Sequence, residues 1–149
     1  MIQHKLLGAS LFALLSLFIS SELFAQADVI EKRQALMKGQ SANAKAIKGA
    51  VEAKDYATIE TKAKDLMGSS EKIVDAFPKG STKGKTKATD AIWEKSDDFA
   101  KNAKNLRKAA SELADAAKAM DAGIDVKVKA VGDVCGGCHK AFRAEKYSE

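Results

Sequence analysis

The chain contains a single proline, Pro78, and its apolar residues recur at steps of three and four positions on both sides of it. Ala, Lys, Glu, Asp and Leu dominate the composition, whereas clusters of β-branched residues are scarce. This period and this composition predict amphipathic helices rather than strands. We therefore expect an all-α fold, an antiparallel four-helix bundle.

Capping and breaking residues place the ends of these helices. Asp28 is a candidate N-cap for the first helix. The second helix is expected to end near Phe77, because Pro78 follows. Ser96 is the expected N-cap of the third helix, and Gly123 is expected to end it. The expected helices span residues 28–51, 55–76, 96–123 and 125–146, with a long loop over 77–90.

The apolar stripe assigns side chains to the interior of the bundle. Met67 of the second helix and Met120, which lies on the stripe of the third, are both expected in the core. The expected inner face of the first helix consists of Ile30, Arg33, Met37, Gln40, Ala44, Ile47 and Val51.

The N-terminal segment has the layout of a secretory signal peptide. Lys5 precedes an apolar run from Leu6 to Ile19, which is shorter than the ~20 residues that a membrane-spanning helix needs. Ala25-Gln26-Ala27 is a small-x-small cleavage site, so we expect cleavage after Ala27, with Ala25 as the alternative. A retained anchor is less favoured because no charged stop-transfer cluster follows. The expected product is a periplasmic domain of residues 28–149 that is not held in the membrane.

Charge patterning argues against nucleic acid as a partner. The net charge is +5, and it stays +5 when Lys5 and Glu22 leave with the signal. Most lysines alternate with acidic residues, which is typical of solvated helix faces. The loop from Lys79 to Lys87 is the one locally positive stretch. It could steer an acidic redox partner, although a merely soluble loop is the simpler interpretation.

The two cysteines, Cys135 and Cys138, are separated by two glycines and followed directly by His139. A disulfide that closes so short a loop would add little stability. Cys-x-x-Cys-His is the attachment spacing of c-type haem, in which two thiols bond to the porphyrin and the adjacent imidazole reaches the iron. Gly136 and Gly137 add no bulk between the two thiols. The sequence therefore predicts one covalently bound haem c.

Three other kinds of site use two cysteines and a histidine: a redox-active dithiol, a zinc site and a structural disulfide. A thioredoxin-type dithiol would lie near a βαβ pattern, which the chain lacks. A zinc site needs four ligands, but His4 leaves with the signal, and the remaining chain has no histidine besides His139 and no third cysteine. A surface disulfide beside an unrelated histidine stays open at this point.

The haem motif lies near the C-terminus, within Val131–Arg143, and further short motifs accompany it. They are Arg33-Gln34, the loop Phe77-Pro78-Lys79-Gly80-Ser81 with Gly84 and Thr86 beyond it, and Ile92-Trp93 with Phe99. This combination resembles class II cytochromes c, the cytochrome c′ group. The resemblance implies a four-helix bundle, usually a homodimer, with haem wedged among the helices. It also implies that Arg33 and Gln34 reach the haem propionates, with an ordinary surface pair as the alternative. It likewise implies that Arg143 lies beside His139, with a solvated arginine at the helix end as the alternative.

Met37 stands three positions after Gln34, where the resemblance implies a side chain on the distal side of the haem. Cytochromes c′ usually have an apolar, non-ligating residue there, and their five-coordinate iron binds nitric oxide or carbon monoxide. Low-spin members of the class instead resemble this chain in offering a methionine. A thioether ligand favours electron transfer.

The expected function is therefore that of a monohaem electron carrier, with His139 and Met37 as axial ligands and redox proteins as partners. The alternative is a gas-binding cytochrome c′ in which Met37 is an ordinary core residue. An enzymatic function is not expected, because the first helix offers no distal histidine that could act as acid and base.

Overall fold

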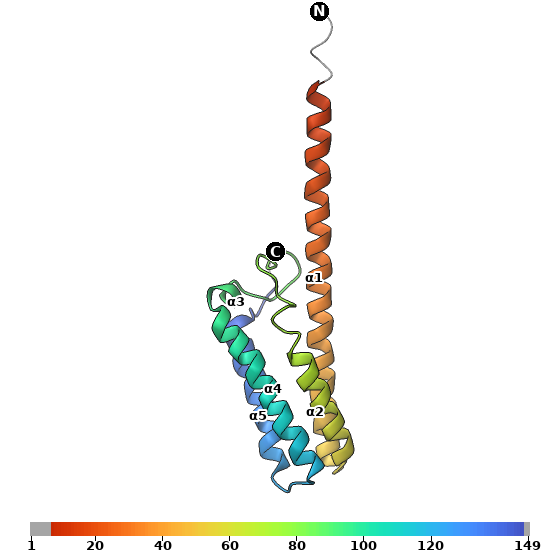
Figure 1. Cartoon of the computed structure of the whole chain (residues 1–149), viewed down its shortest axis with the longest axis vertical. Coiled ribbons are helices and arrows are strands. Elements are labelled where there is room, and N and C mark those ends of the chain that lie inside the picture. The colour runs from red at the N-terminus through yellow and green to blue at the C-terminus, as the bar shows by residue number, and fades with distance from the viewer. Residues whose placement is uncertain (1–6, 148–149) are drawn as a thin grey trace, which may run out of the picture.

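The computed structural model describes the backbone of residues 7–147 and the side chains of residues 27–147. The helices of this part are α1 (Leu7–Glu52), α2 (Tyr56–Ser70), α3 (Ala91–Glu94), α4 (Ser96–Lys118) and α5 (Ile124–Phe142). The four long helices run in alternating directions, and the short α3 lies in the connection between α2 and α4 (Figure 1). The predicted all-α, antiparallel four-helix bundle is confirmed.

Three pairs of long helices make the main packing contacts of the bundle. α2 packs against both α1 and α4, and α4 packs against α5, whereas α1 and α5 barely touch. The long α2–α4 connection and the C-terminal segment lie at the same end of the bundle (Figure 1). α1 extends far beyond that end (Figure 1).

The core includes small residues from both α2 and α4, and Ala63 and Ala110 are fully buried. Small side chains allow packed helices to approach closely. The larger buried apolar side chains of the core cluster are Ile47, Ile59, Leu66, Ile73, Ile92, Phe99, Leu106, Leu113, Ile124, Val131 and Phe142. Met67 packs against this cluster, as expected. Ala44, which was assigned to the inner face of α1, is exposed instead.

α2 ends at Ser70, six residues before the predicted end. The hydroxyl of Ser69 donates to the carbonyl of Leu66 at 3.0 Å, and that of Ser70 donates to the carbonyl of Met67 at 2.7 Å. Such side-chain bonds compete with the helical backbone ladder. The backbone then continues in three-residue turns, such as Ile73 N to Ser70 O at 3.3 Å. Pro78 therefore does not set this boundary.

α4 ends at Lys118, and the residue that ends it is Met120 rather than Gly123. Met120 adopts the left-handed conformation, with φ 51°. Its N–H donates to Ala117 O and that of Asp121 donates to Ala116 O, both at 3.0 Å, which is a Schellman motif. Met120 is 70% exposed, so its assignment to the core was wrong.

Two predicted N-caps are also corrected. α1 is continuous through Asp28, whose carboxylate pairs with Lys32 at 2.6 Å instead of capping a helix. Ser96 is the first residue of α4, and the cap position is held by Lys95, which makes no side-chain capping bond. Lys95 also follows the last residue of α3, Glu94, and its backbone is not helical, with φ −123° and ψ 48°.

α5 ends at Phe142, four residues before the predicted end. Arg143 is extended, and it forms an isolated antiparallel bridge with Ala88 of the α2–α4 connection. The N–H of Ala144 donates to the carbonyl of Lys87 at 2.8 Å. The C-terminal segment thus bonds to the loop over 77–90 in place of a further helical turn.

The predicted signal peptide lies largely outside the residues whose side chains are described, so its removal stays a prediction. Within the part of the chain that was searched, no helix has the length and the apolar character needed to cross a membrane.

Candidate haem site

The last turns of α5 present Cys135, Cys138 and His139 at positions i, i+3 and i+4, which share one face of the helix. Both cysteines are free thiols, half-buried against the core cluster. The surface disulfide left open by the sequence is therefore not formed. Burial raises the pKa of both thiols, and the charge of Cys135 raises the pKa of Cys138 further.

His139 lies at the exposed margin of this face, in the final turn of α5. Partial shielding from water lowers the pKa of its imidazole, and the nearby charge of Arg143 lowers it further. A neutral imidazole is the form that binds a metal. The shift therefore favours the ligating form of His139.

The two glycines between the thiols test whether this face fits a porphyrin. Gly136 and Gly137 are exposed, and a Cβ atom built at either one would meet no other part of the protein within 4 Å. Packing within the chain therefore does not require glycine at these positions. Their small size keeps the surface beside Cys135 and Cys138 open, which fits a flat macrocycle bonded to both thiols.

The donor set fits haem better than a bare metal ion. Among the described residues, no group of three or more His, Cys, Asp or Glu side chains could hold a metal. Two thiols next to one histidine instead match covalent haem attachment with a single proximal ligand.

An aromatic cluster supports α5 behind the motif. Phe142 packs edge-to-face on Phe99 at 5.2 Å between ring centroids, and Phe99 packs in the same way on Phe77 at 5.1 Å. Trp93 donates its indole N–H to the carbonyl of Phe77 at 3.0 Å, so it anchors the loop. Met37 and Val134 are half-buried against the same core. Met37 thus lies on the inner side of α1, as predicted.

Arg33 is the most unusual residue near the site, because it is only 2% exposed and pairs with no described carboxylate. Its guanidinium donates to Ser81 Oγ and Thr86 Oγ1, both at 2.7 Å, and lies 5.1 Å from the centre of the Phe77 ring. Burial lowers the pKa of Arg33. Sequence reasoning missed these three partners, although all belong to the loop motif that accompanies Arg33-Gln34.

The other two predicted site residues lie at the same end of the bundle. Gln34 donates its amide N–H to the carbonyl of Lys85 at 2.7 Å, so α1 holds the loop at a second point. Arg143 follows α5 directly, and its backbone N–H donates to the carbonyl of His139 at 3.0 Å. Its side chain is exposed beside the histidine.

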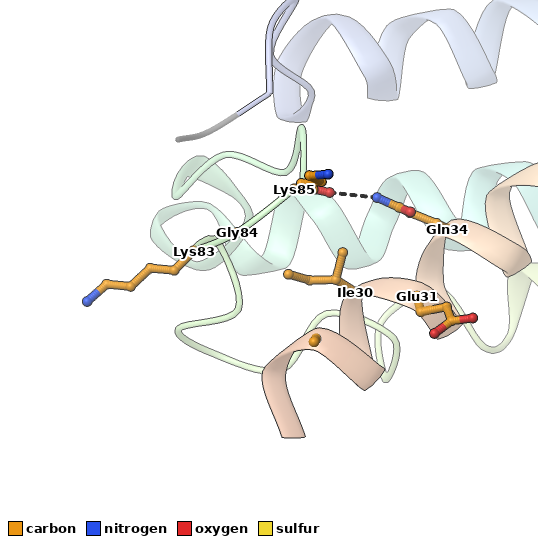
Figure 2. Close-up of a pocket in the computed structure, with 7 residues that line it drawn as sticks. Ile30, Glu31, Gln34, Lys83, Gly84 and Lys85 are labelled. Atoms are coloured by element: carbon orange, nitrogen blue, oxygen red, sulfur yellow. Dashed lines mark hydrogen bonds between the residues drawn. The ribbon is translucent and has the colours of Figure 1, made fainter. Parts of the chain in front are cut away.

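A hollow of about 370 Å³ lies between α1 and the loop, apart from the haem motif. Ile30 and Gln34 line it on one side and Lys83 to Lys85 on the other (Figure 2). Gly84 has φ +101°, and a Cβ there would lie 3.3 Å from Ile30 Cδ1. The hollow contains neither cysteine nor His139, so it is not the attachment face.

Comparison with known proteins identifies the family. The family model described as cytochrome C′ matches residues 28–143. The chain belongs to the cytochrome c′ family. Members of this family carry covalently bound haem c, so the predicted cofactor is confirmed.

The similar proteins include a cytochrome c-556 and cytochromes c′. A cytochrome c-556 of Agrobacterium tumefaciens is 36% identical over 113 residues, which is 75% of this chain and 82% of the relative. A cytochrome c′ of Rhodospirillum rubrum is 40% identical over 85 residues, 56% of this chain and 58% of the relative. The solved structure of cytochrome c prime from Shewanella frigidimarina has a TM-score of 0.74 at 31% identity and covers 80% of this chain and 97% of that one.

Proposed function

We propose that the protein is a periplasmic monohaem cytochrome c′ that binds small gases, nitric oxide or carbon monoxide, on the distal side of its haem. The observation that carries the proposal is the common face of α5 with two free thiols and His139, in a chain matched by the cytochrome c′ model over residues 28–143. Haem iron held by one histidine leaves a position at which such gases bind. Cys135 and Cys138 attach the group, and His139 is its proximal ligand.

Arg33 and Gln34 are proposed to hold the propionates of the haem. A buried guanidinium without a carboxylate is costly, so an anion beside Arg33 would offset that cost. Hydrogen bonds to the hydroxyls of Ser81 and Thr86 already hold the Arg33 guanidinium in one orientation. Arg143 is proposed to keep the His139 imidazole neutral, because the positive charge of Arg143 lowers the pKa of His139.

The role of Met37 determines whether the haem iron has an open distal position or a sixth ligand from the protein. Its contact with the core cluster is that of a packing residue, and relatives of this chain are named cytochrome c′. Both observations favour an open distal position beside a non-ligating Met37.

Electron transfer with Met37 as sixth ligand is the second candidate. One observation favours it: Met37 lies one helical turn after the buried Arg33 and is itself only half-buried, so its thioether is not enclosed by the protein. A soft thioether ligand would raise the potential of the haem.

The absorption spectrum of the ferrous holoprotein at neutral pH tests the two candidates. An open position predicts a five-coordinate, high-spin spectrum and rapid carbon monoxide binding, which Met37→Leu leaves nearly unchanged. This swap conserves volume and should cost less than about 1.5 kcal/mol of stability. A low-spin spectrum that turns high-spin in the Leu variant would reject the gas-binding proposal and establish Met37 as the ligand.

Assembly as a homodimer is also proposed, since this is usual for the family that the chain resembles. One solved relative, 24% identical with a TM-score of 0.74, is described as a cytochrome c′ with ligand-controlled dimer dissociation. The molar mass of the holoprotein in solution, with and without carbon monoxide, tests the assembly: a monomeric mass in both states would reject it.

A further inference from the structure

Two segments at one end of the bundle are rich in positive charge. Residues 77–90 hold four lysines and one aspartate, and residues 140–147 hold three lysine or arginine side chains and one glutamate. The two segments together carry a net charge of +5, which equals the net charge of the whole chain. The charges of all other residues sum to zero.

These two segments form one continuous surface. The N–H of Thr89 donates to the carbonyl of Phe142 at 3.2 Å, and Ala88 bridges Arg143. On the other side, Arg33 and Gln34 of α1 bond to the same loop. The loop is thus held from both sides, and its lysines project from a fixed backbone at the end of the bundle where α5 presents His139.

Some lysines outside this surface form ion pairs, such as Lys64 with Glu60 at 2.5 Å and Lys129 with Asp133 at 2.6 Å. Others, such as Lys45 and Lys48 of α1, join no ion pair among the described residues. Within the described residues, Lys79, Lys83 and Lys85 are exposed and join no ion pair. Lys83 extends away from α1, so the nearby acid Glu31 does not neutralise it (Figure 2).

We propose that this basic surface, residues 77–90 with residues 140–147, is the docking surface for an acidic redox protein. The inference rests on one part of the proposed function, the attachment of haem at Cys135 and Cys138: a protein that exchanges electrons with the haem iron has a reason to dock here because the haem motif ends at the same place. A fixed cluster of like charges attracts and orients a partner of opposite charge.

A protein fits this surface better than an anionic membrane. Membrane-surface binding combines basic residues with an apolar anchor. Among the large apolar side chains described as exposed, Met120 and Val126 border the opposite turn between α4 and α5, and Val74 precedes the loop by three residues. The basic surface itself offers only Tyr147, whose ring is in contact with the Lys87 ammonium at 5.0 Å.

Binding of a fluorescent polyglutamate peptide to the holoprotein tests the proposal. The Lys83→Glu/Lys85→Glu variant should bind the peptide about tenfold more weakly at low salt. The matched control is Lys45→Glu/Lys48→Glu, which makes the same charge change at exposed α1 positions that join no described ion pair. The control should stay within about twofold of the unmodified protein. Equal weakening in both variants would overturn the proposal, because only net charge would matter.

Phosphatidylcholine vesicles with and without phosphatidylglycerol form the second arm. Stronger binding to the anionic vesicles than to the peptide, lost in the loop variant, would assign the surface to a membrane and contradict an acidic protein partner. Oxidation of the ferrous holoprotein by ferricyanide then locates the surface relative to the haem. The loop variant should slow this one-electron transfer about tenfold and the control should not. An unchanged rate would overturn the redox role.

Haem content and the carbon monoxide spectrum separate this proposal from the proposed function. Both charge variants should match the unmodified protein in these two measurements, because neither changes a residue assigned to haem binding. If the unmodified protein contains no haem, the proposed function is rejected. If the loop variant has normal haem content and binds the peptide as tightly as the unmodified protein, only the docking surface is rejected.

Discussion

Arg33 of α1 donates two hydrogen bonds to Ser81, which lies 48 residues later in the chain. Nη1 reaches Ser81 Oγ at 2.7 Å, and Nη2 reaches the Ser81 carbonyl at 2.5 Å. The Ser81 hydroxyl itself donates to the carbonyl of Pro78 at 2.8 Å. Both residues are buried, so this pair holds the loop over 77–90 against the first helix.

Ser81→Ala should destabilise the holoprotein by about 1–3 kcal/mol, because a buried guanidinium N–H loses its acceptor. Urea unfolding measures the change. Thr61→Ala is the control, since the Thr61 hydroxyl bonds to the carbonyl of Ala57 on an exposed helix face and should cost less than about 0.5 kcal/mol. An equal decrease in the free energy of unfolding in the two variants would mean that the hydrogen bond between Arg33 and Ser81 stabilises the protein no more than an exposed one.

Asp55 should make part of the stability depend on pH. It is the N-cap of α2, and hydrogen bonds from the Thr58 hydroxyl and backbone N–H lower the pKa of its carboxyl. A lowered folded-state pKa gives stability that is complete above the ordinary carboxyl pKa and is lost as the pH falls through the lowered value. Asp55→Asn keeps a capping side chain without this titration.

The melting temperatures of the two proteins across acidic pH measure this contribution. The advantage of the unmodified protein over Asp55→Asn should be largest near neutral pH and should shrink on acidification. A constant difference at every pH would show that the carboxylate charge is irrelevant to the cap.

Met120→Gly should stabilise the protein by about 1 kcal/mol, because only glycine adopts the left-handed conformation without a Cβ penalty. The exposed Met120 side chain loses little packing on removal. Met120→Ala keeps the Cβ atom and should show no comparable gain in thermal unfolding. A gain in the Ala variant as large as in the Gly variant would assign the effect to the methionine side chain.

The bundle and its motif face were predictable because both depend on local periodicity. Apolar steps of three and four residues place Ile47, Ile59, Leu66 and Leu113 inside, and the same geometry places Cys135, Cys138 and His139 on one side of α5. These features require no knowledge of distant contacts.

The predictions failed where tertiary contacts or unusual backbone angles decide the structure. α5 stops at Phe142 because Ala144 bonds to a loop more than fifty residues earlier, which no local pattern encodes. α4 ends at Lys118 because Met120 adopts the left-handed conformation that glycine usually takes after a helix, so the prediction that Gly123 ends this helix was wrong. The partners of Arg33 are likewise non-local, and the sequence gives their types but not their distances.

Folding should depend on haem attachment. The core contains many alanines, and a bundle built around a large macrocycle would lose packing contacts without it. Cys135→Ala/Cys138→Ala should therefore unfold over a broad temperature range, as followed by helical circular dichroism. A transition as sharp and as high as that of the holoprotein would place the haem outside the core.

The intact mass of the denatured holoprotein tests the central claim most directly. Covalent attachment through Cys135 and Cys138 predicts a mass raised by one haem that survives acid denaturation, and a haem-bearing peptide that spans Cys135 to His139 after proteolysis. The Cys135→Ala/Cys138→Ala variant should lack this added mass. A haem that dissociates on denaturation, or one that remains bound in the double variant, would contradict the account.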